Sequence, residues 1–419
     1  MKNKLTIGVF SEMLSECNGT AEAVRRLVIG LGKAGHTVHV FAPGNGVAGK
    51  PNVNFHQAAH IINFRMSRDP EFYLSIPFIR YVFNNYGYYK ELDIVHAATP
   101  MTVGALGLDV SKIQGIPKII THHSPLKYYA GDYFPVIGKA FAFYAWKYER
   151  LFYNRFHVRH VPTLSKKQLI LQYKIKEPIF ALTNGILDEY FLKTHDARSE
   201  VLEHYKIPLD KKIMLYAGRH GPEKNIEAIL RALRAVRDQG IDAHLISAGG
   251  GPHIPALMKY AQELKITENV TFTGWIKHGW QRKVYDAADV SLLYNDIEAQ
   301  GLVLLEAMAQ GTPCIGKNSC GIKDVIVHGK TGFLANTERD FARYIAKVLT
   351  NKTLQEELGN NALAEVTRTH KMSNVIPVWE KVYRHMINVA FPEDFVHTPV
   401  DKVIEHWRAF CAKEPLLKM

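Results

Sequence analysis

The sequence predicts an α/β protein of two domains, each a parallel β-sheet with helices on both faces. Three observations carry this prediction. The chain has 419 residues, a length that suits about two ordinary domains. Short, nearly continuous apolar runs alternate with segments of helical periodicity, which is the pattern of strands buried on both faces of a sheet. The alternation stops near residue 190 and restarts near residue 213, so we expect two separate sheets.

The first sheet begins with an apolar strand at residues 5–10. A helix follows over 20–34, with Ala23, Leu27 and Leu31 on one face and Gly35 at its end. Further strands of this sheet are expected at 37–41, 94–96, 118–121 and 156–162. The first domain is therefore predicted to span residues 1–190.

The second sheet restarts after a polar, irregular stretch, 191–212, which we interpret as a linker. A strand at 213–217 is followed by a helix over 225–238 and by strands at 243–248, 270–272, 290–293 and 314–316. This domain is predicted to span 213–375. Val378, Val382 and Met386 then recur at helical spacing, so helices over about 376–419 are expected to return to the first domain.

The composition is that of a globular protein, with 47% apolar and 22% charged residues. The four cysteines have no metal-ligand spacing, so neither a zinc site nor a disulfide framework is expected, and a reducing compartment fits best. They are Cys17, Cys314, Cys320 and Cys411. The sequence has no run of 18 apolar residues and no signal-like start, which predicts a cytoplasmic protein whose contact with the inner face of the cell membrane is at most peripheral.

The net charge of +12 is unevenly distributed. Residues 1–190 carry 22 Lys and Arg against 13 Asp and Glu, a net charge of +9, and the remaining residues carry 30 against 27. A basic first half suggests an anionic partner surface, although solubility alone would also explain it. No nucleic-acid recognition motif is present, so no nucleic-acid partner is predicted.

Ligands of such folds bind beyond the carboxyl ends of the strands, where loops enter helices. The first such loop ends in Asn18-Gly19-Thr20 at a helix start, where free N–H groups favour a phosphate. An ordinary helix cap would look the same.

The loop at 218–225 places two cations around a Gly-Pro turn. Arg219 and Lys224 can both point toward a ligand, and a departing pyrophosphate needs such charges. Taken alone, the pair would also suit a solvated basic turn.

The loop at 298–311 brackets a glycine with two carboxylates, Glu298 and Glu306. Glu306 has apolar sequence on both sides, and a carboxylate there is costly unless it has hydrogen-bond donors. Hydroxyl groups of a ligand are such donors. The alternative is that Glu306 points to solvent.

Together, these residues resemble the retaining glycosyltransferases of family 4, which have the GT-B fold of two Rossmann-like domains facing each other across a cleft. The resemblance covers roughly residues 3–370 and rests on the order and spacing of several short segments. They are Gly35-His36, Asp93-Ile-Val-His96, Thr121-His-His-Ser-Pro125, Thr183-Asn-Gly185, Gly249-Gly-Gly-Pro252 and Gly274-Trp-Ile276, with Arg219, Lys224, Glu298 and Glu306.

The resemblance implies a role for each matching residue. The catalytic residues would be His123, Glu298, Arg219 and Lys224. Glu298 would bind hydroxyls of the transferred sugar, and His123 would contact the donor sugar. The donor nucleotide-sugar would be bound by Gly19, Arg219, Lys224, Gly249, Gly301, Leu302, Val303 and Glu306, with Glu306 on the ribose. It also implies a UDP-linked sugar as co-substrate, with no metal and no further cofactor.

Two positions depart from the family pattern. Asn18 stands where the family often has glycine, and Gly250 stands where it often has an acidic residue. Both departures concern phosphate placement and donor choice rather than a charged catalytic group.

The acceptor is expected on the first domain, which is rich in aromatic and basic residues over 72–90 and 127–160. Such a belt suits the headgroup region of an anionic bilayer, although about half of these aromatic residues are expected to be ordinary core residues. Ala98-Thr-Pro-Met101, Thr121-His-His-Ser-Pro125 and Tyr133-Phe-Pro135 most resemble the branch of the family that glycosylates diacylglycerol. We therefore predict transfer of a hexose to a lipid such as diacylglycerol. A soluble or glycan acceptor, a sugar-nucleotide epimerase and an inactive binding module of the same fold remain alternatives.

Overall fold

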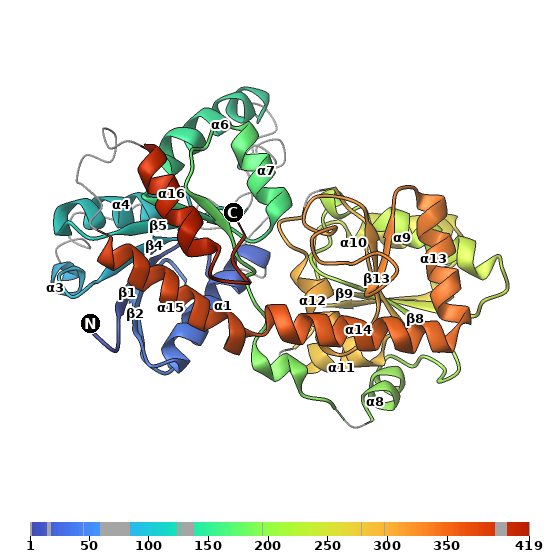
Figure 1. Cartoon of the computed structure of the whole chain (residues 1–419). Coiled ribbons are helices and arrows are strands. Elements are labelled where there is room, and N and C mark those ends of the chain that lie inside the picture. Colours follow the sequence, from blue (N-terminus) through green and yellow to red (C-terminus); the bar gives the residue numbers. More distant parts are fainter. Residues whose placement is uncertain are drawn as a thin grey trace. The chain divides into compact units, whose positions relative to one another are not determined.

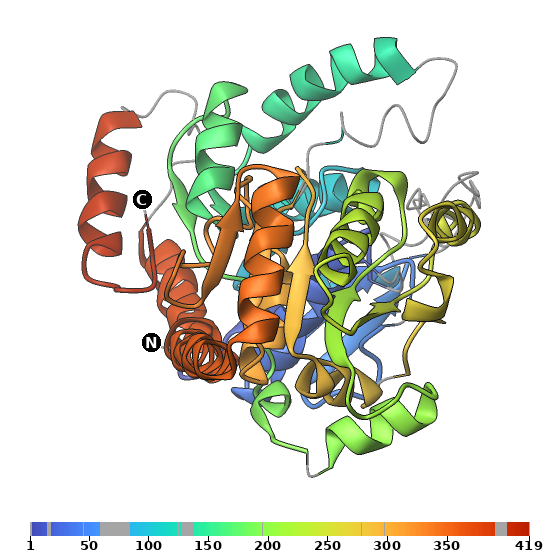
Figure 2. The same cartoon turned by 90° about the vertical axis from the view of Figure 1, so that its right-hand side faces the viewer.

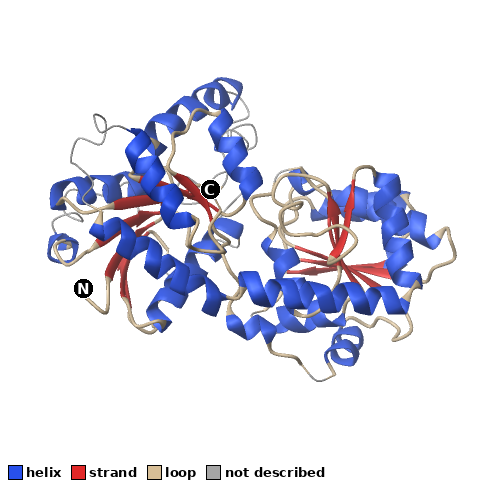
Figure 3. Cartoon of the chain, in the orientation of Figure 1, coloured by secondary structure: helices blue, strands red, loops and turns tan. Residues whose placement is uncertain are grey.

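The computed structural model describes residues 2–14, 18–44, 46–58, 84–123, 126, 138–194, 196–277, 279–296, 298–389 and 400–418. The chain forms two compact units (Figure 1). Unit 1 comprises residues 1–185 and 372–419, and unit 2 comprises 186–371. Each has one sheet with helices packed around it (Figure 3), so the predicted fold class is confirmed. No helix of the described residues is long and apolar enough to cross a membrane.

The sheet of unit 1 is parallel throughout, in the order β3-β2-β1-β4-β5-β6-β7. The first strand of the chain, β1 (Thr6–Phe10), lies inside this sheet, and its Ile7 pairs with Val38 on one side and Ile94 on the other. The strands are β1 (Thr6–Phe10), β2 (Thr37–Ala42), β3 (Val53–Gln57), β4 (Ile94–Ala97), β5 (Lys118–Thr121), β6 (Val158–Val161) and β7 (Ile179–Ala181).

The helices of unit 1 include two from the end of the chain. Helix α15 packs against α1 at Gly30, where an added Cβ would lie 2.6 Å from the end of the Ile376 side chain and would require that side chain to move. The helices are α1 (Gly19–Lys33), α3 (Tyr86–Tyr89), α4 (Thr102–Gln114), α6 (Gly138–Tyr153), α7 (Leu164–Gln172), α15 (Met372–Asn388) and α16 (Val400–Cys411).

The C-terminal tail docks on unit 1, as predicted. Trp407 of α16 is buried and stacks on Phe180 of β7 at a ring distance of 5.9 Å. Lys418 pairs with Ala181 through two backbone hydrogen bonds of 2.7 and 3.0 Å. The tail therefore covers the edge strand β7, which would otherwise expose unpaired backbone groups. Residues 390–399 of the predicted tail lie outside the described part.

Unit 2 has a second parallel sheet, in the order β10-β9-β8-β11-β12-β13, with helices on both faces (Figure 2). Its strands are β8 (Lys212–Ala217), β9 (Ala243–Ala248), β10 (Val270–Gly274), β11 (Val290–Leu293), β12 (Cys314–Lys317) and β13 (Gly332–Ala335). Its helices are η1 (Asp188–Phe191), α8 (Ala197–His204), η2 (Pro222–Lys224), α9 (Ile226–Arg237), α10 (Ile254–Glu263), η3 (Thr267–Asn269), α11 (Trp280–Ala287), α12 (Leu302–Ala309), α13 (Glu338–Thr350) and α14 (Lys352–His370).

The predicted linker over 191–212 is wrong, because most of that stretch is a structured part of unit 2. Helix α8 buries Val201 and Leu202 completely and packs against α11. Arg198 ties it to the sheet by hydrogen bonds to the Ala287 carbonyl at 2.8 Å and the Asp289 carboxylate at 3.2 Å. One apolar pair in a polar helix gives too weak a periodicity to be recognised in the sequence. The chain instead passes between the units at residues 185–186 and 371–372.

Each sheet has one point where the strand order reverses. In unit 1, β1 lies between β2 and β4, and in unit 2, β8 lies between β9 and β11. The loops that leave neighbouring strands at such a point run to opposite faces of the sheet, which opens a crevice for ligands at the strand ends. The residues predicted to bind the donor follow β1, β8, β9 and β11, which lie at these points.

Candidate active site

The reversal point of unit 2 brings together charged residues from two loops far apart in sequence. Lys224, after β8, has its Nζ 2.5 Å from Oε1 of Glu298, which follows β11. Arg219 forms an ion pair with Glu223 within its own loop. The Tyr216 hydroxyl donates a 2.8 Å hydrogen bond to the Arg219 carbonyl, which fixes the backbone of this turn. Both cations are about one-fifth exposed, so each is within reach of a ligand.

Glu298 is held from two further directions. Asn295 donates a hydrogen bond to its Oε1 at 3.1 Å. Gly321 lies directly behind its backbone, because an added Cβ there would be 2.6 Å from the Glu298 carbonyl oxygen. The carboxylate position is therefore determined by the packing of the loop as well as by Lys224.

Glu306 does not point into solvent. It lies on α12 between the buried residues Leu305 and Ala307 and is itself only 8% exposed. The Tyr285 hydroxyl, from α11, donates a 2.6 Å hydrogen bond to its Oε2. A buried carboxylate needs such donors, and Tyr285 supplies one that the sequence analysis did not identify.

The start of α12 is suited to an anion. Gly301 precedes it in the left-handed conformation, with φ of 74°, and its carbonyl accepts from the Leu304 N–H at 3.0 Å. Leu302 and Val303 are the first two residues of the helix, so their N–H groups have no acceptor inside it. Such groups and the helix dipole favour negative charge.

At two positions of the predicted donor loop, Gly249 and Gly250, the fold itself leaves no room for a side chain. Gly249 has φ of +131°, and an added Cβ would lie 2.0 Å from the Gly218 carbonyl oxygen. Its N–H already donates to the Gly274 carbonyl at 3.0 Å. Gly250 lies under the half-exposed Trp275, whose indole nitrogen would be 2.4 Å from a Cβ at that position. Trp275 thus occupies the space that the acidic side chain of the family pattern would need.

Gly19 begins α1 in unit 1 and is open to its surroundings. Apart from its chain neighbours and the backbone of its own helix, no described residue has an atom within 4 Å of the position of an added Cβ. Asn18 caps the helix by accepting a 2.9 Å hydrogen bond from the Ala21 N–H. The segment thus has both the cap and the accessible helix start that the sequence suggested.

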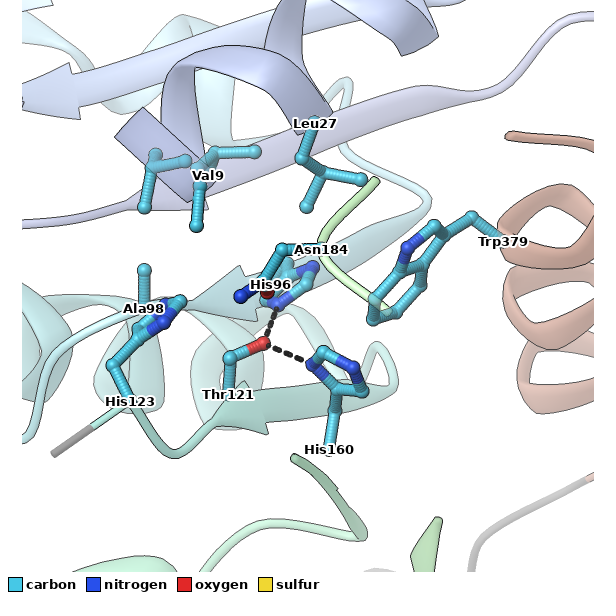
Figure 4. Close-up of a pocket in the computed structure, with 11 residues that line it drawn as sticks. Val9, Leu27, His96, Ala98, Thr121, His123, His160, Asn184 and Trp379 are labelled. Carbon is cyan, nitrogen blue, oxygen red and sulfur yellow. Dashed lines mark hydrogen bonds between the residues drawn. The ribbon is translucent and has the colours of Figure 1, made fainter. Parts of the chain in front are cut away.

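Unit 1 has a hollow at its own reversal point, and several of its lining residues come from strand ends (Figure 4). It encloses about 340 Å³ together with the space at its open mouth. Apolar side chains of β1 and α1 lie across from a group of polar side chains that follow or end β4, β5 and β6. The lining residues are Val9, Ala23, Val24, Leu27, His96, Ala98, Thr121, His123, His160, Asn184 and Trp379.

His123, predicted to contact the donor sugar, lines this hollow. It lies two residues beyond β5 and is 8% exposed. Burial, together with the nearby His160 and Lys166, lowers the pKa of its imidazole to about 3. The ring is therefore neutral near pH 7, so it can donate or accept a hydrogen bond but does not supply a positive charge.

The sequence did not single out some of the residues that line or support these sites. His96 appeared only as the last residue of the segment Asp93-Ile-Val-His96 and was given no role, and His160 was not named at all. In hindsight, their position as polar residues near the ends of apolar strands indicates a binding edge. Tyr285, Asn295 and Trp379 carried no such signal, because only the packing of elements distant in sequence brings them to these sites.

Both halves of the chain match known families. Residues 17–190 match the family described as Glycosyltransferase Family 4, and residues 198–365 match the family described as Glycosyl transferases group 1. The chain is 28% identical over 379 residues to the alpha-monoglucosyldiacylglycerol synthase of Streptococcus pneumoniae, covering 84% of this chain and 82% of that protein. The protein of the same name from Acholeplasma laidlawii is 25% identical over 377 residues, covering 85% and 92%.

Solved structures agree on the fold. Anabaena Alr3699/HepE, solved in complex with UDP and glucose, superposes with a TM-score of 0.73 at 16% identity, over 91% of this chain and all of that one. Since the two matches together cover most of the chain and the fold is GT-B, the chain is a glycosyltransferase whose first half belongs to Glycosyltransferase Family 4 and whose second half belongs to Glycosyl transferases group 1.

Proposed function

We propose that this enzyme transfers a hexose from a UDP-linked sugar, UDP-glucose or a close analogue, to a membrane lipid such as diacylglycerol, with retention of the anomeric configuration. Two relatives that match more than four-fifths of the chain are named alpha-monoglucosyldiacylglycerol synthase. The observation that carries the lipid assignment is an exposed aromatic and basic face on helix α6 of unit 1.

The donor half of the proposal rests on the paired charges of unit 2. A diphosphate would compete with Glu223 for Arg219 and with Glu298 for Lys224. Each cation can stabilise charge on the departing phosphate by on the order of 4 kcal/mol at an effective dielectric constant near 20. Glu306 would accept hydrogen bonds from the ribose hydroxyls, and Glu298 would bind hydroxyls of the sugar.

Retention follows from the chemistry that the resemblance implies. The leaving diphosphate would remove the proton of the acceptor hydroxyl on the face where the new bond forms, so no nucleophilic side chain is needed. Arg219 and Lys224 would neutralise the diphosphate in place of a metal ion. We therefore expect transfer in the presence of EDTA to stay within about twofold of the untreated rate, and a requirement for Mg²⁺ or Mn²⁺ would contradict this.

The face of α6 has the composition of a membrane-interface helix. Tyr144, Tyr148 and Leu151 are 61, 45 and 62% exposed and recur at spacings of four and three residues, so they share one side of the helix. Lys147 lies over the Tyr144 ring at 5.5 Å. Aromatic and aliphatic groups beside cations fit the headgroup region of an anionic bilayer.

No exposed carboxylate opposes these charges on the described side chains of α6, residues 144–153. Its one acidic residue, Glu149, is buried and accepts a 3.0 Å hydrogen bond from the Leu126 N–H. Of the other predicted aromatic residues, 72–83 and 127–137 lie outside the described residues.

The membrane assignment can be tested by sedimentation with vesicles that contain anionic lipid. Leu151→Ser is expected to reduce the bound fraction severalfold, because it removes apolar area from the membrane-facing side. Ile113→Ser is the matched control, since Ile113 is 69% exposed on α4 of the same unit. Equal losses for both variants, or none for Leu151→Ser, would contradict the assignment.

The main alternatives differ in what they require. A transferase with a soluble or glycan acceptor would release UDP without lipid once that acceptor is added. A sugar-nucleotide epimerase would convert its substrate with no acceptor at all. Omitting the acceptor therefore separates the epimerase from both transferases, and exchanging lipid for soluble sugars separates the transferases from each other.

A further inference from the structure

A continuous chain of hydrogen bonds runs beneath the hollow of unit 1. The Tyr383 hydroxyl on α15 lies 2.7 Å from Nδ1 of His96, and Nε2 of His96 lies 2.7 Å from the Thr121 hydroxyl. That hydroxyl is 2.9 Å from Nδ1 of His160, whose Nε2 is 2.7 Å from the Leu182 carbonyl oxygen. The two bonds made by Thr121 are drawn in Figure 4.

The direction of this chain follows from its last member. A carbonyl oxygen can only accept, so Nε2 of His160 carries the proton, and Nδ1 of a neutral ring must then accept from Thr121. The Thr121 hydroxyl has a single hydrogen, so it must accept from Nε2 of His96. Nδ1 of His96 is then an acceptor, and Tyr383 is its donor. With neutral rings, one arrangement satisfies all four hydrogen bonds.

The surroundings favour neutral rings. His96 and His160 are each 1% exposed. Burial lowers the pKa of His96 well below its ordinary value, with His160 and His123 adding to the effect, and burial lowers the pKa of His160 to about 4. Burial also raises the pKa of Tyr383, which keeps its hydroxyl protonated.

The groups packed around the two rings carry no carboxylate among the contacts of the described residues. His96 faces Tyr383 and Trp379, at ring distances of 6.0 and 5.1 Å. His160 faces Trp379 at 4.7 Å and Phe180 at 5.2 Å. These aromatic neighbours restrict the rotation of both imidazole rings. Each ring therefore has a fixed orientation as well as a fixed position of its N–H proton.

The chain of hydrogen bonds is connected through the backbone to the loop that carries His123. Thr121 is the last residue of β5, and the next residue, His122, donates its backbone N–H to the His160 carbonyl at 2.8 Å. All four ring nitrogens of His96 and His160 are used within the chain. Of the three histidines that line the hollow, His123 is the one whose ring takes no part in it.

We propose that Thr121 and Tyr383 are positioning residues, which hold His96 and His160 as neutral Nε2–H tautomers and thereby fix the backbone that presents His123. The catalytic part of this inference rests on the proposed transferase function, and the tautomer assignment does not.

The tautomers can be measured directly by long-range ¹H–¹⁵N correlation NMR on protein labelled at histidine. His96 and His160 should both show neutral Nε2–H signatures from pH 6 to 8. Tyr383→Phe should shift Nδ1 of His96, because that nitrogen loses its donor. Tyr89→Phe is the matched control, since the buried Tyr89 hydroxyl has no hydrogen-bond partner within the described residues. An Nδ1–H tautomer or an imidazolium at either histidine in the wild type would overturn the proposal.

Kinetics test the positioning role. Thr121→Val keeps the shape of the side chain but removes both hydrogen bonds, and we expect kcat for transfer to fall by about tenfold or more. Thr121→Ser, which keeps the hydroxyl, should recover most of that loss. UDP affinity, measured by calorimetry, should be unchanged in both, because Arg219, Lys224 and Glu306, which are proposed to bind the diphosphate and the ribose, lie in unit 2. Wild-type kcat in Thr121→Val, or an equal loss in Thr121→Ser, would refute positioning. If the wild type transfers no sugar, the proposed function fails, and the NMR experiment still decides the tautomers.

Discussion

At the residue scale, the candidate catalytic groups of unit 2 are paired with one another. Each cation has a carboxylate partner, Arg219 with Glu223 and Lys224 with Glu298. A donor diphosphate therefore gains only the difference between its own attraction and that of the carboxylate it displaces. This makes donor affinity sensitive to single charge changes at the site.

Removal of a donor-binding side chain should slow transfer strongly. We expect Lys224→Ala and Glu306→Ala each to lower kcat/KM by more than 100-fold. This corresponds to a loss of at least about 3 kcal/mol of transition-state stabilisation. Lys211→Ala is the matched control, because Lys211 also forms an ion pair in unit 2, with Asp242 at 2.6 Å. Turnover near the wild-type value in either site variant would refute these roles.

Neutralising Glu223 should have the opposite effect on binding. Glu223→Gln removes the carboxylate that competes for Arg219, so UDP affinity should rise severalfold, and more at low salt. Glu338→Gln removes the carboxylate of another Arg–Glu pair of unit 2, with Arg231 at 2.6 Å, and should leave UDP affinity unchanged. Weaker UDP binding by Glu223→Gln would show that Glu223 supports the site rather than competing for it.

The charged residues and glycines of this site could be predicted from the sequence, whereas the residues that hydrogen-bond to them could not. Glu306 stands out because a carboxylate in apolar sequence needs hydrogen-bond donors, and Glu298 stands out because it lies just ahead of the same helix. Glycines at loop positions suggest close backbone approach. Tyr285 lies 21 positions before Glu306 on another helix, and a tyrosine in an amphipathic helix is ordinary. Its relevance appears only when α11 packs beside α12.

At the element scale, the loop after β1 is fastened to helix α4 by a buried carboxylate. Glu12 is fully buried and accepts hydrogen bonds from the Thr99 hydroxyl and the Val103 N–H at the start of α4. The Thr102 hydroxyl donates to it as well, at 3.2 Å. Burial nevertheless raises the pKa of Glu12 to about 7, although these hydrogen bonds oppose that rise.

This raised pKa predicts a pH dependence of stability. Between about pH 4.5 and 7 the folded protein holds a proton on Glu12 that the unfolded chain has lost. The contribution of Glu12 is therefore fully present below pH 4.5 and is lost as the pH rises through 7, by about 3 kcal/mol in total.

Urea denaturation from pH 4.5 to 8 measures this effect. Glu12→Gln, which cannot ionise, should remove this fall in unfolding free energy. Glu405→Gln, at an exposed carboxylate of unit 1, should follow the wild type. A wild-type curve with the same slope as that of Glu12→Gln would contradict the assignment.

The strands and helices that the sequence predicted were those with a clear pattern of apolar residues. The apolar strands β1, β8 and β9 and the amphipathic helices α1 and α9 lie within a residue or two of their expected positions. Strand β3 was missed because it is an edge strand with polar residues on both faces, Val53-Asn-Phe-His-Gln57. Strand β7 has only three residues, too few to show any period.

At the scale of the whole molecule, the basic charge and the α6 face both belong to the first half of the chain. Residues 1–190 carry a net charge of +9, and Tyr144, Tyr148 and Leu151 are exposed on a helix of the same unit. If the membrane is the anionic partner, electrostatic attraction and apolar insertion act on the same surface.

Vesicle binding should therefore depend on lipid charge and on salt. We expect the bound fraction to rise with the proportion of anionic lipid and to fall at least severalfold when salt is raised from 50 to 500 mM, as the charges are screened. Binding to neutral vesicles that equals binding to anionic ones would contradict this. The sequence predicted the basic half, but only the fold shows that Tyr144 and Tyr148 are exposed on α6, with Lys147 partly exposed beside them and no exposed carboxylate among the described side chains of that helix.

The most direct test of the central claim is sugar transfer from a panel of UDP-, GDP- and ADP-sugars, with and without diacylglycerol in anionic liposomes. We predict release of UDP from a UDP-hexose that depends on diacylglycerol, together with an α-linked glycolipid if the donor sugar is α-linked. UDP release at the same rate without lipid, or full transfer to a soluble sugar, would contradict the lipid acceptor, and turnover with GDP- or ADP-sugars alone would contradict the donor.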